Sequence, residues 1–389
     1  MMEIRIVLRA GKKVRFILLL IAGFLLYTAW PVIEHKLGLE DQPVLNKMKS
    51  EMESLKEHPE FLGLTEEISR LKNLFTQTLE SVPKDLQPEQ PIKIEKPDLK
   101  TPTDQSFSIA NIELGETKTE VEEQLGSAKR STHNEYGTEW HTYHDHYHNF
   151  LMVAFNQDNK VAGIYSNQDL IKAKNGITYG TPKENVLDKM GEPLEKIQKG
   201  LVYYQLPIER DYDIFLLDGS YTTIFYDKHK NNSVTAIQVV STTLENERQQ
   251  FYTEASNALL SGFEYQLFDL TNAARVQHGL QSLAWDEAVR ETARSHSLDM
   301  AENNYFNHTN LEGQSPFDRM AEDGISFSVA GENLAYGQTS SVFAHEGLMN
   351  SKGHRENILK EDFKLLGVGV AFNSKSQPYY TENFYTKRF

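Results

Sequence analysis

Hydrophobic and polar positions divide the chain into an apolar N-terminal segment, a polar stretch and two regions patterned like folded domains. The apolar segment, Phe16–Ile33, contains no charged residue. As a helix it would span about 27 Å, close to the ~30 Å hydrocarbon core of a bilayer. Basic residues precede it, and Tyr27 and Trp30 lie at its far end, where interfacial aromatic residues are common. This pattern predicts a transmembrane signal-anchor at residues 16–33, with residues 1–15 in the cytoplasm and the rest outside the cell.

A cleaved secretory signal peptide is the alternative for this segment. The apolar core of a signal peptide is usually shorter and ends in small residues before the cleavage site. Here the corresponding stretch, Thr28–Val32, reads TAWPV, which is a poor cleavage sequence. We therefore expect an uncleaved anchor.

Residues 34–106 lack the pattern of a packed core and predict a helical and proline-rich stalk. Five apolar residues in it follow helical spacing: Leu64, Ile68, Leu71, Phe75 and Leu79. This stripe could form a dimer through the stalk or dock on a folded domain, and a solvated stalk helix explains it equally well. Prolines at intervals from Pro83 to Pro102 then favour an extended spacer.

Residues 107–243 contain an internal duplication. The segment Ile112–Gly126 (IELGETKTEVEEQLG) recurs as Ile177–Gly191 (ITYGTPKENVLDKMG). Each copy predicts a glycine turn, then a short helix that stops at a second glycine. Predicted strands separated by polar turns follow the helices, at residues 150–155, 161–165, 222–226 and 234–240. We interpret this region as one α+β domain built from two related halves.

Residues 264–389 combine helical and strand patterns and follow a predicted helical connector at 244–263. Apolar stripes predict helices at Glu264–His278, at Trp285–Met300 and at Ser340–Ser351. Runs of β-branched and aromatic residues predict strands at Leu365–Phe372 and Tyr379–Tyr385. Helices before and between strands predict an α-β-α layered domain, so the expected fold class of the whole chain is α+β.

Composition narrows the function classes. The chain has no cysteine, so it has no disulfide, no thiol nucleophile and no thiolate zinc site. The formal net charge is −15, and the first 33 residues carry five basic residues and one acidic residue. The predicted exported part is therefore strongly acidic and would repel nucleic acid and anionic lipid headgroups. We expect no nucleic-acid partner.

Short motifs in a fixed order run through about 120 C-terminal residues. They include LTNAAR at Leu270–Arg275, YFNH at Tyr305–His308, GEN at Gly331–Asn333, GHR at Gly353–Arg355 and YTENF at Tyr380–Phe384. This set resembles the CAP superfamily of cysteine-rich secretory, antigen five and pathogenesis-related proteins, especially its cysteine-free bacterial branch. The resemblance implies a CAP fold, which is an α-β-α sandwich. The duplicated region resembles the CAP-associated N-terminal domain of membrane-anchored proteins from Bacillus-type bacteria.

In the CAP family a central cleft holds two histidines and two acids that can bind a divalent metal. The resemblance implies that His308, Glu332 and His354 occupy three of these positions. Ser351 stands where the second acid would be, and Glu346 lies nearby but out of register. Ser351 and Asn333 are expected to line the same pocket.

Two kinds of chemistry are open for this cleft. Two imidazoles and a carboxylate could bind a divalent metal such as zinc and leave a position for water, although a missing acid would weaken the site. As a metal-dependent hydrolase the site would use Glu332 and His354. No HExxH helix is present, and Ser351 does not lie on a nucleophile elbow. Alternatively, the side chains hydrogen-bond one another and brace the cleft without metal.

The remaining histidines offer weaker candidates. His296 lies on an apolar helical stripe, so we expect a core histidine, and we expect His345 at the surface. In a strand, His144, His146 and His148 would point the same way and could bind a metal. The same alternation also describes an exposed polar strand face, and we favour that interpretation.

The expected protein is a single-pass cell-membrane protein whose C-terminal bulk lies outside the cytoplasm. Its predicted function is non-enzymatic binding of an envelope, cell-wall or other extracellular ligand. Alternatives are a metal-dependent, peptidase-like hydrolase of extracellular peptide or cell-wall material, and a structural envelope spacer. The CAP resemblance does not choose among them, because one fold hosts many functions.

Overall fold

The structure is a computed structural model, which describes residues 94–388 except residues 200 and 249. The predicted anchor and most of the predicted stalk lie outside these described residues. None of the helices in the described part is long and apolar enough to cross a membrane.

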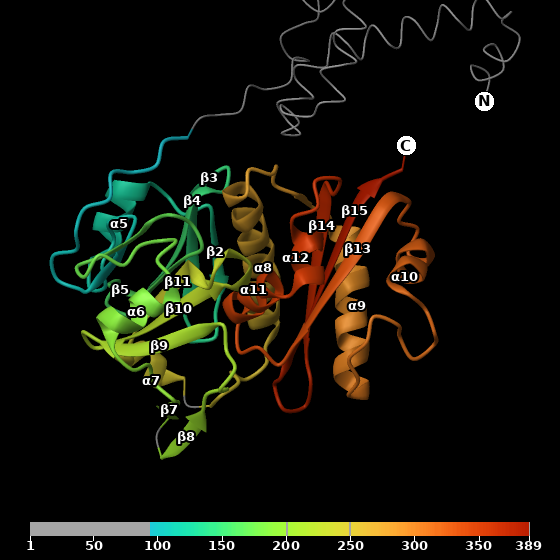
Figure 1. Cartoon of the computed structure of the whole chain (residues 1–389). Helices are drawn as coiled ribbons and strands as arrows, with labels where there is room; N and C mark the ends of the chain where they lie inside the picture. Colours follow the sequence, from blue (N-terminus) through green and yellow to red (C-terminus); the bar gives the residue numbers. More distant parts are fainter. Residues whose placement is uncertain (1–93, 200, 249, 389) are drawn as a thin grey trace, which may run out of the picture. The chain divides into compact units, whose positions relative to one another are not determined.

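The duplicated region forms an antiparallel seven-stranded sheet with the order β2-β3-β4-β5-β11-β10-β9 (Figure 1). Its two halves meet where β5 pairs with β11. The strands are β2 (Arg130–His133), β3 (Glu139–Asp145), β4 (His148–Phe155), β5 (Val161–Ser166), β9 (Tyr212–Leu217), β10 (Ser220–Asp227) and β11 (Ser233–Ser241).

The two halves repeat the same local hydrogen bonds. Helix α5 (Lys118–Leu125) opens the first half and α6 (Lys183–Met190) opens the second, and each is capped by a glycine with positive φ. Before each helix a glycine amide donates to the last strand of its own half. Gly115 donates to the Val161 carbonyl at 2.9 Å, and Gly180 donates to the Val234 carbonyl at 2.8 Å. The predicted duplication is therefore visible in three dimensions.

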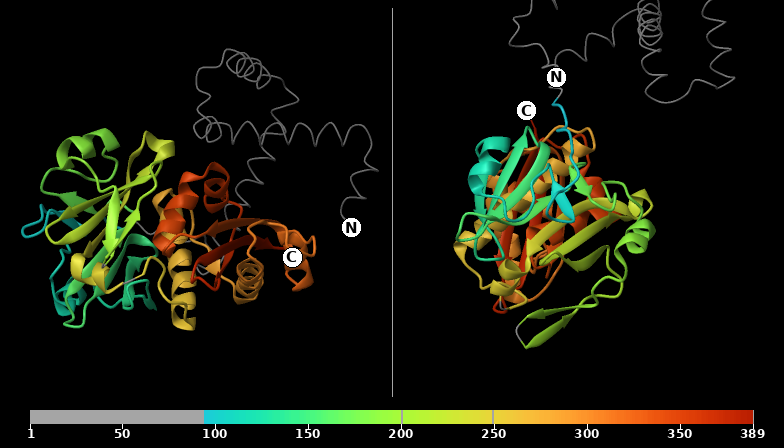
Figure 2. Two further views of the ribbon diagram at one scale, coloured as in Figure 1. Left: turned by 90° about the horizontal axis from the view of Figure 1, so that it is seen from below. Right: turned by 90° about the vertical axis from the view of Figure 1, so that its left-hand side faces the viewer.

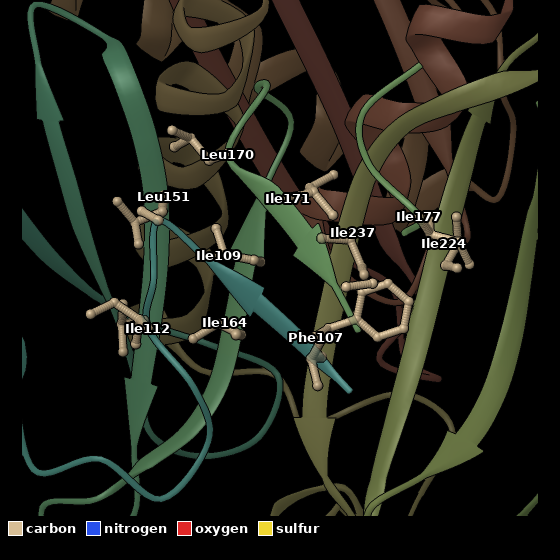
Figure 3. Packing of buried hydrophobic residues seen from close by; sticks show 14 of the residues in the cluster. Phe107, Ile109, Ile112, Leu151, Ile164, Leu170, Ile171, Ile177, Ile224 and Ile237 are labelled. Carbon is tan, nitrogen blue, oxygen red and sulfur yellow. The ribbon is translucent and has the colours of Figure 1, made fainter. Parts of the chain in front are cut away.

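Both faces of this sheet are buried, which explains the nearly continuous apolar run in β4. One face packs under the short pair β1 (Phe107–Ile109) and β6 (Ile171–Ala173). Figure 3 shows this core, whose labelled residues are Phe107, Ile109, Ile112, Leu151, Ile164, Leu170, Ile171, Ile177, Ile224 and Ile237. The opposite face packs against the C-terminal region. Burial of each such side chain contributes roughly 1.5–3 kcal/mol to folding.

A two-stranded hairpin stands apart from the large sheet. It consists of β7 (Lys196–Lys199) and β8 (Val202–Gln205), which pair with each other. Figures 1 and 2 show it projecting from the second half of the duplicated region. Helix α7 (Thr242–Glu247) follows β11.

The C-terminal region is an α-β-α sandwich. Its sheet has the order β12-β14-β15-β13, with helix α9 on one side and α8 on the other (Figure 1). Glycines at 367 and 369 let β14 lie directly on α9, since a Cβ at either position would come within 2.3 Å of the α9 backbone. The elements are α8 (Asn257–Gln277), β12 (Ala284–Trp285), α9 (Glu287–Asn303), α10 (Pro316–Glu322), β13 (Phe327–Tyr336), α11 (Ser341–Asn350), α12 (Lys352–Ile358), β14 (Leu365–Phe372) and β15 (Pro378–Lys387).

Helix α8 joins the duplicated region to the sandwich. Residues 266–275 are buried all round, because the helix lies between strands β2 and β4 on one side and β14 on the other. One hydrophobic cluster contains Trp140 and Phe150 from the first region together with Leu270 and Val342 from the second. The two regions therefore share a hydrophobic core and are packed against each other, rather than being separate domains joined by a linker.

Several boundaries differ from the sequence-based expectation. Helix α8 begins at Asn257, inside the predicted connector, and β13 was not predicted because Gly331, Glu332 and Asn333 interrupt its apolar pattern. The end of the predicted stalk is also bound to the folded body. The backbone amides of Thr103, Asp104 and Gln105 donate to the Glu113 carboxylate at 2.6–2.9 Å.

Candidate functional site

At the centre of the predicted site lies a buried carboxylate, Glu332. The side chains of Arg319 and His308 contact its two oxygens. Glu332 lies on β13 with its side chain 1% exposed. Its Oε2 accepts from Arg319 Nη2 at 2.6 Å, and its Oε1 lies 2.9 Å from His308 Nδ1. Arg319 comes from α10 and also donates to the His308 backbone carbonyl at 2.8 Å. Arg319 thus fixes both the carboxylate and the loop that carries His308.

His308 is the exposed member of this group, with its side chain 51% accessible. Because a carboxylate only accepts hydrogen bonds, Nδ1 of His308 carries the proton in this contact. Nε2 makes no hydrogen bond within the described residues. The contact therefore selects one tautomer and presents a defined nitrogen beside the buried ion pair.

His354 lies on α12 and is half-buried. Burial lowers its pKa, and the neighbouring His308 lowers it further. The two imidazoles are therefore close enough to influence each other electrostatically. The His354 backbone is also fixed, because its carbonyl accepts from Asn333 Nδ2 at 3.2 Å.

Asn333, which was expected to line the pocket, has its side chain inside the protein. It is fully buried, and its Nδ2 also donates to Glu382 at 3.0 Å, while its Oδ1 accepts from Asn357 at 3.0 Å. Thr271 donates to the other oxygen of Glu382 at 2.7 Å. Burial raises the pKa of Glu382 to about 7. This network ties α8, β13, β15 and α12 together under the site.

The two candidates for the second acid do not extend this cluster. Ser351 is the residue at which α11 ends and α12 begins, and its side chain makes no capping hydrogen bond. Glu346 is buried and accepts from Tyr165 of the duplicated region at 2.6 Å. Burial raises the pKa of Glu346 to about 7. Glu346 therefore belongs to the contact between the two regions.

Among the described residues, no three His, Asp or Glu side chains are arranged to hold a metal ion. The donor chemistry around Glu332 agrees with this, because both carboxylate oxygens already have partners. A guanidinium against Oε2 would also repel a dication at that position. In this arrangement Glu332 has no free oxygen to offer a metal ion.

His296 and His345 are both buried. His296 is a core histidine, as predicted, with Nε2 2.9 Å from the Asn307 carbonyl. The predicted surface position of His345 is wrong: it is 1% exposed and lies 3.4 Å from Asn167 of the duplicated region. Burial lowers the pKa of His345 to about 3. Its burial depends on the neighbouring region, which a local helical pattern does not reveal.

The expectation that His144, His146 and His148 share one strand face is also wrong. Strand β3 ends at Asp145 and β4 begins at His148, so the segment is a hairpin. His146 and Tyr147 form its turn with φ of +47° and +64°. The His144 ring stacks on Tyr147 at 4.2 Å, and burial lowers its pKa to about 4.

Arg319 was not singled out from the sequence. It also lines a cavity of about 470 Å³ together with His296, Asp299, Glu322 and Asp323. This cavity is not lined by His308, Glu332 or His354. No sequence motif marks Arg319, and its role becomes visible only when α10 is placed beside β13.

Known proteins resemble both regions. The family model for the CAP-associated N-terminal domain matches residues 114–251, and that for the cysteine-rich secretory protein family matches residues 268–384. The Bacillus subtilis protein named uncharacterized membrane protein YlbC is 30% identical over 288 residues, which are 70% of this chain and 82% of that relative. The chain belongs to the cysteine-rich secretory protein family. Its C-terminal sandwich is a CAP domain, and its duplicated region is a CAP-associated domain.

Other relatives support the same family assignment. The Bacillus subtilis protein YkwD is 40% identical over 135 residues, covering 35% of this chain and 51% of that protein. The crystal structure of an extracellular protein with an SCP domain from Bacillus anthracis has a TM-score of 0.61 and 25% identity, covering 78% of this chain and all of that chain. A cysteine-rich secretory protein from Staphylococcus aureus has a TM-score of 0.57 at 14% identity, covering 75% of this chain and 99% of that chain, which shows the fold alone. These matches agree that the C-terminal region is a CAP domain.

Proposed function

We propose that this protein is anchored in the cell membrane by residues 16–33 and binds an envelope or extracellular ligand in its CAP cleft without catalysing a reaction. The uncharged segment at the N-terminus supports the anchor. The relative YlbC, which is named a membrane protein, also supports it. The CAP and CAP-associated domains would then lie outside the cytoplasm.

The observation that carries the binding proposal is the fixed presentation of His308. Its ring is half exposed but is held from below by Glu332, which Arg319 holds in turn. Fixing a polar group before binding lowers the ordering cost that a ligand must overcome. The outer nitrogen of His308, beside the half-buried His354, suits a ligand that carries hydroxyl or amide groups, as wall polymers and peptides do.

The same geometry argues against a general base at Glu332. A base must have an oxygen free to take a proton, whereas both oxygens of this carboxylate already contact Arg319 or His308. The metal-dependent hydrolase therefore has less support than binding. Elemental analysis of the purified protein tests directly whether it binds a metal.

The decisive experiment is retention of the full-length protein on purified, insoluble cell-wall material. We expect His308→Ala and His354→Ala each to weaken retention about tenfold, in line with the loss of one or two good hydrogen bonds. His146→Ala is the matched control, because His146 is an exposed histidine on the β3–β4 turn, in the other domain. It should bind like the unaltered protein, and so should protein treated with a chelator.

Two outcomes would contradict the proposal. One is equal retention of all three variants. The other is stoichiometric zinc in the purified protein by elemental analysis, together with wall or peptide cleavage that a chelator abolishes. The second outcome would establish the hydrolase in place of a binding protein.

A further inference from the structure

The loop that follows helix α9 lies along strand β13, and two contacts fix its course. The His308 ring meets the Glu332 carboxylate, and the Phe306 ring meets Tyr336 at the end of β13, with the ring centroids 5.9 Å apart. Glu332 and Tyr336 are four residues apart on one strand, so their side chains lie on the same side, about 13 Å from each other. An aromatic pair, Phe306 and Tyr336, therefore extends the polar site along β13.

Both rings of this pair are open to solvent. Phe306 is 49% exposed and Tyr336 is 38% exposed. A single exposed aromatic residue is common on a protein surface, but two in contact form an apolar patch. Such a patch beside polar groups commonly marks an interaction site. Its position next to His308 points to the ligand of the same site.

The loop holds Phe306 in place from both sides. On one side, the backbone amide of Tyr305 donates to the Met300 carbonyl at 3.2 Å. On the other side, the carbonyl of Asn307 lies 2.9 Å from Nε2 of the buried His296. The exposed ring is thus attached to a fixed backbone, and a ligand that stacks on it does not have to order the loop first.

Two side-chain amides beside the rings offer hydrogen-bond donors. Asn307 Oδ1 accepts from the Thr309 backbone amide at 3.0 Å, and Gln377 Oε1 accepts from the Tyr336 hydroxyl at 3.0 Å and from Asn373 Nδ2 at 2.9 Å. Because each amide oxygen is already engaged, the NH₂ group is the part that remains for a ligand. Neither NH₂ group donates to another group in the part of the chain that the structure describes.

The charges around the rings disfavour an anionic ligand. Arg319, the cation that contacts this loop, is already paired with Glu332 at 2.6 Å. The Asp299 carboxylate accepts from the Tyr305 hydroxyl and from Asn303 Nδ2, so it adds negative charge beneath the loop. A polymer rich in phosphate or carboxylate groups would find repulsion here and no free cation among these groups.

We infer that Phe306 and Tyr336 form a stacking platform for the sugar rings of an oligosaccharide that extends into the CAP cleft. One face of a sugar ring consists of C–H groups, which suit the negatively polarised face of an aromatic ring. The hydroxyl and acetamido oxygens at the edge of the sugar accept from the NH₂ groups of Asn307 and Gln377, and the next ring reaches His308. This inference rests on the binding function proposed above and deepens it, because it names the saccharide part of wall material, rather than its peptides, as the ligand.

The test is titration calorimetry of the purified full-length protein with chitotetraose, a linear chain of N-acetylglucosamine rings. We expect saturable binding. Phe306→Leu keeps an apolar side chain but removes the ring, and should weaken binding about tenfold, whereas Phe306→Tyr keeps the ring and should bind within about twofold of the unaltered protein. Phe317→Leu is the matched control, because Phe317 is 46% exposed in the same domain and contacts Phe327. It should leave binding unchanged.

Thermal unfolding checks that Phe306→Leu is folded, and Tyr336→Leu provides a second variant with the same expected loss. The inference is overturned if chitotetraose does not bind, if both leucine variants bind it unchanged, or if Phe317→Leu weakens binding as much. It is also overturned if acetyl-tetraalanine-amide or poly(glycerol phosphate) binds more tightly than chitotetraose and loses affinity in the same variants. Such results would assign the platform to a peptide or to an anionic polymer.

The two proposals can fail separately. Wall retention that depends on His308 and His354, without chitotetraose binding, would support the cleft and overturn the sugar platform. Chitotetraose binding that depends on Phe306 but not on His308 would support the platform and contradict the role proposed for His308.

Discussion

The two halves of the CAP-associated domain share a sequence motif and a set of hydrogen bonds, yet they meet the CAP domain differently. In the first half the outer strand β2 pairs with β3 and lies directly on helix α8. In the second half the equivalent stretch forms the separate β7–β8 hairpin and leaves β9 as the outer strand of the sheet. The first half packs closely against the CAP domain, whereas the second half lines a cavity.

The side chains at these two places reflect the difference. The first half is joined to α8 by a buried carboxylate, Asp269, which accepts from Arg130 and from Tyr147, both at 3.0 Å. The second half contacts the CAP domain through Phe343 and through an Arg355–Asp227 ion pair at 2.9 Å, with unsatisfied polar atoms beside this contact. The two halves of one sheet therefore contact the CAP domain in different ways, the first through a buried carboxylate and the second through a ring contact and an ion pair.

The largest effect should come from two helix glycines that face the two halves. A Cβ on Gly262 of α8 would lie 2.0 Å from the His133 carbonyl oxygen of β2. Gly262→Ala should therefore force the domains apart and lower the free energy of unfolding by about 3 kcal/mol, as overpacking does. Gly347→Ala of α11 faces open space and should raise it by up to about 1 kcal/mol. Urea unfolding of the two variants measures both changes.

If the two alanine variants changed the free energy of unfolding equally, the two halves would not differ in how closely they pack against the CAP domain. If Gly262→Ala were tolerated, α8 could shift away from β2 without cost, and the first half would not be sealed. If Gly347→Ala were strongly destabilising, the space beside α11 would not be open.

A smaller effect concerns Glu346, which lies between Tyr165 of the first half and the cavity. Burial raises the pKa of Glu346 to about 7 from the ordinary value of 4.5. The folded protein thus holds this proton more tightly than the unfolded chain. Its stabilising contribution is present below about pH 4.5 and is lost as the pH rises through about 7. Asp227 raises this pKa further and Arg355 lowers it.

Glu346→Gln should remove this dependence, because the amide keeps an acceptor for Tyr165 and does not ionise. Relative to the variant, the unaltered protein should lose about 3 kcal/mol of stability between pH 4.5 and pH 7.5. Chemical unfolding across this range measures the difference. Parallel curves for the two proteins would show that Glu346 stays ionised or reaches solvent.

The smallest expected change in stability tests whether the glycine turns of the two halves are still equivalent. Gly115 and Gly180 occupy equivalent turns with φ of +95° and +83°, and a Cβ at either would meet no atom within 4 Å. Alanine at each should therefore cost only backbone strain, about 1–2 kcal/mol, and the two costs should be similar. Thermal unfolding of the single variants compares them. A cost in one half alone would show that the turns have diverged as the outer strands have.

The sequence pattern predicted well those elements whose apolar residues face a single local neighbour. Strand β14 has the predicted bounds, Leu365–Phe372, and the duplicated glycine turns and helices are in place. The sequence pattern gave wrong predictions where a residue is buried by a distant part of the chain. The pattern of its own helix predicts a surface position for His345, yet the CAP-associated domain covers it.

The candidate site was predicted in part for the same reason. The motifs identified Glu332, His308 and His354, and the structure brings the first two into contact. Arg319 carries no motif, and its pairing with Glu332 depends on how a short helix packs against β13. Likewise, positive φ at His146 and Tyr147 turns the chain where alternation alone suggested a continuous strand.

The shared core around Trp140 and Leu270 has a consequence for how this protein can be divided. A CAP domain excised at residue 257 would expose the faces of α8 and α11 that now contact β2, β4 and β10, including Leu270, Ala273 and Val342. Such a fragment would aggregate or seek another partner for that surface. The smallest independent unit is therefore the two domains together, and a single cut in the loop after α7 would leave both pieces held to each other.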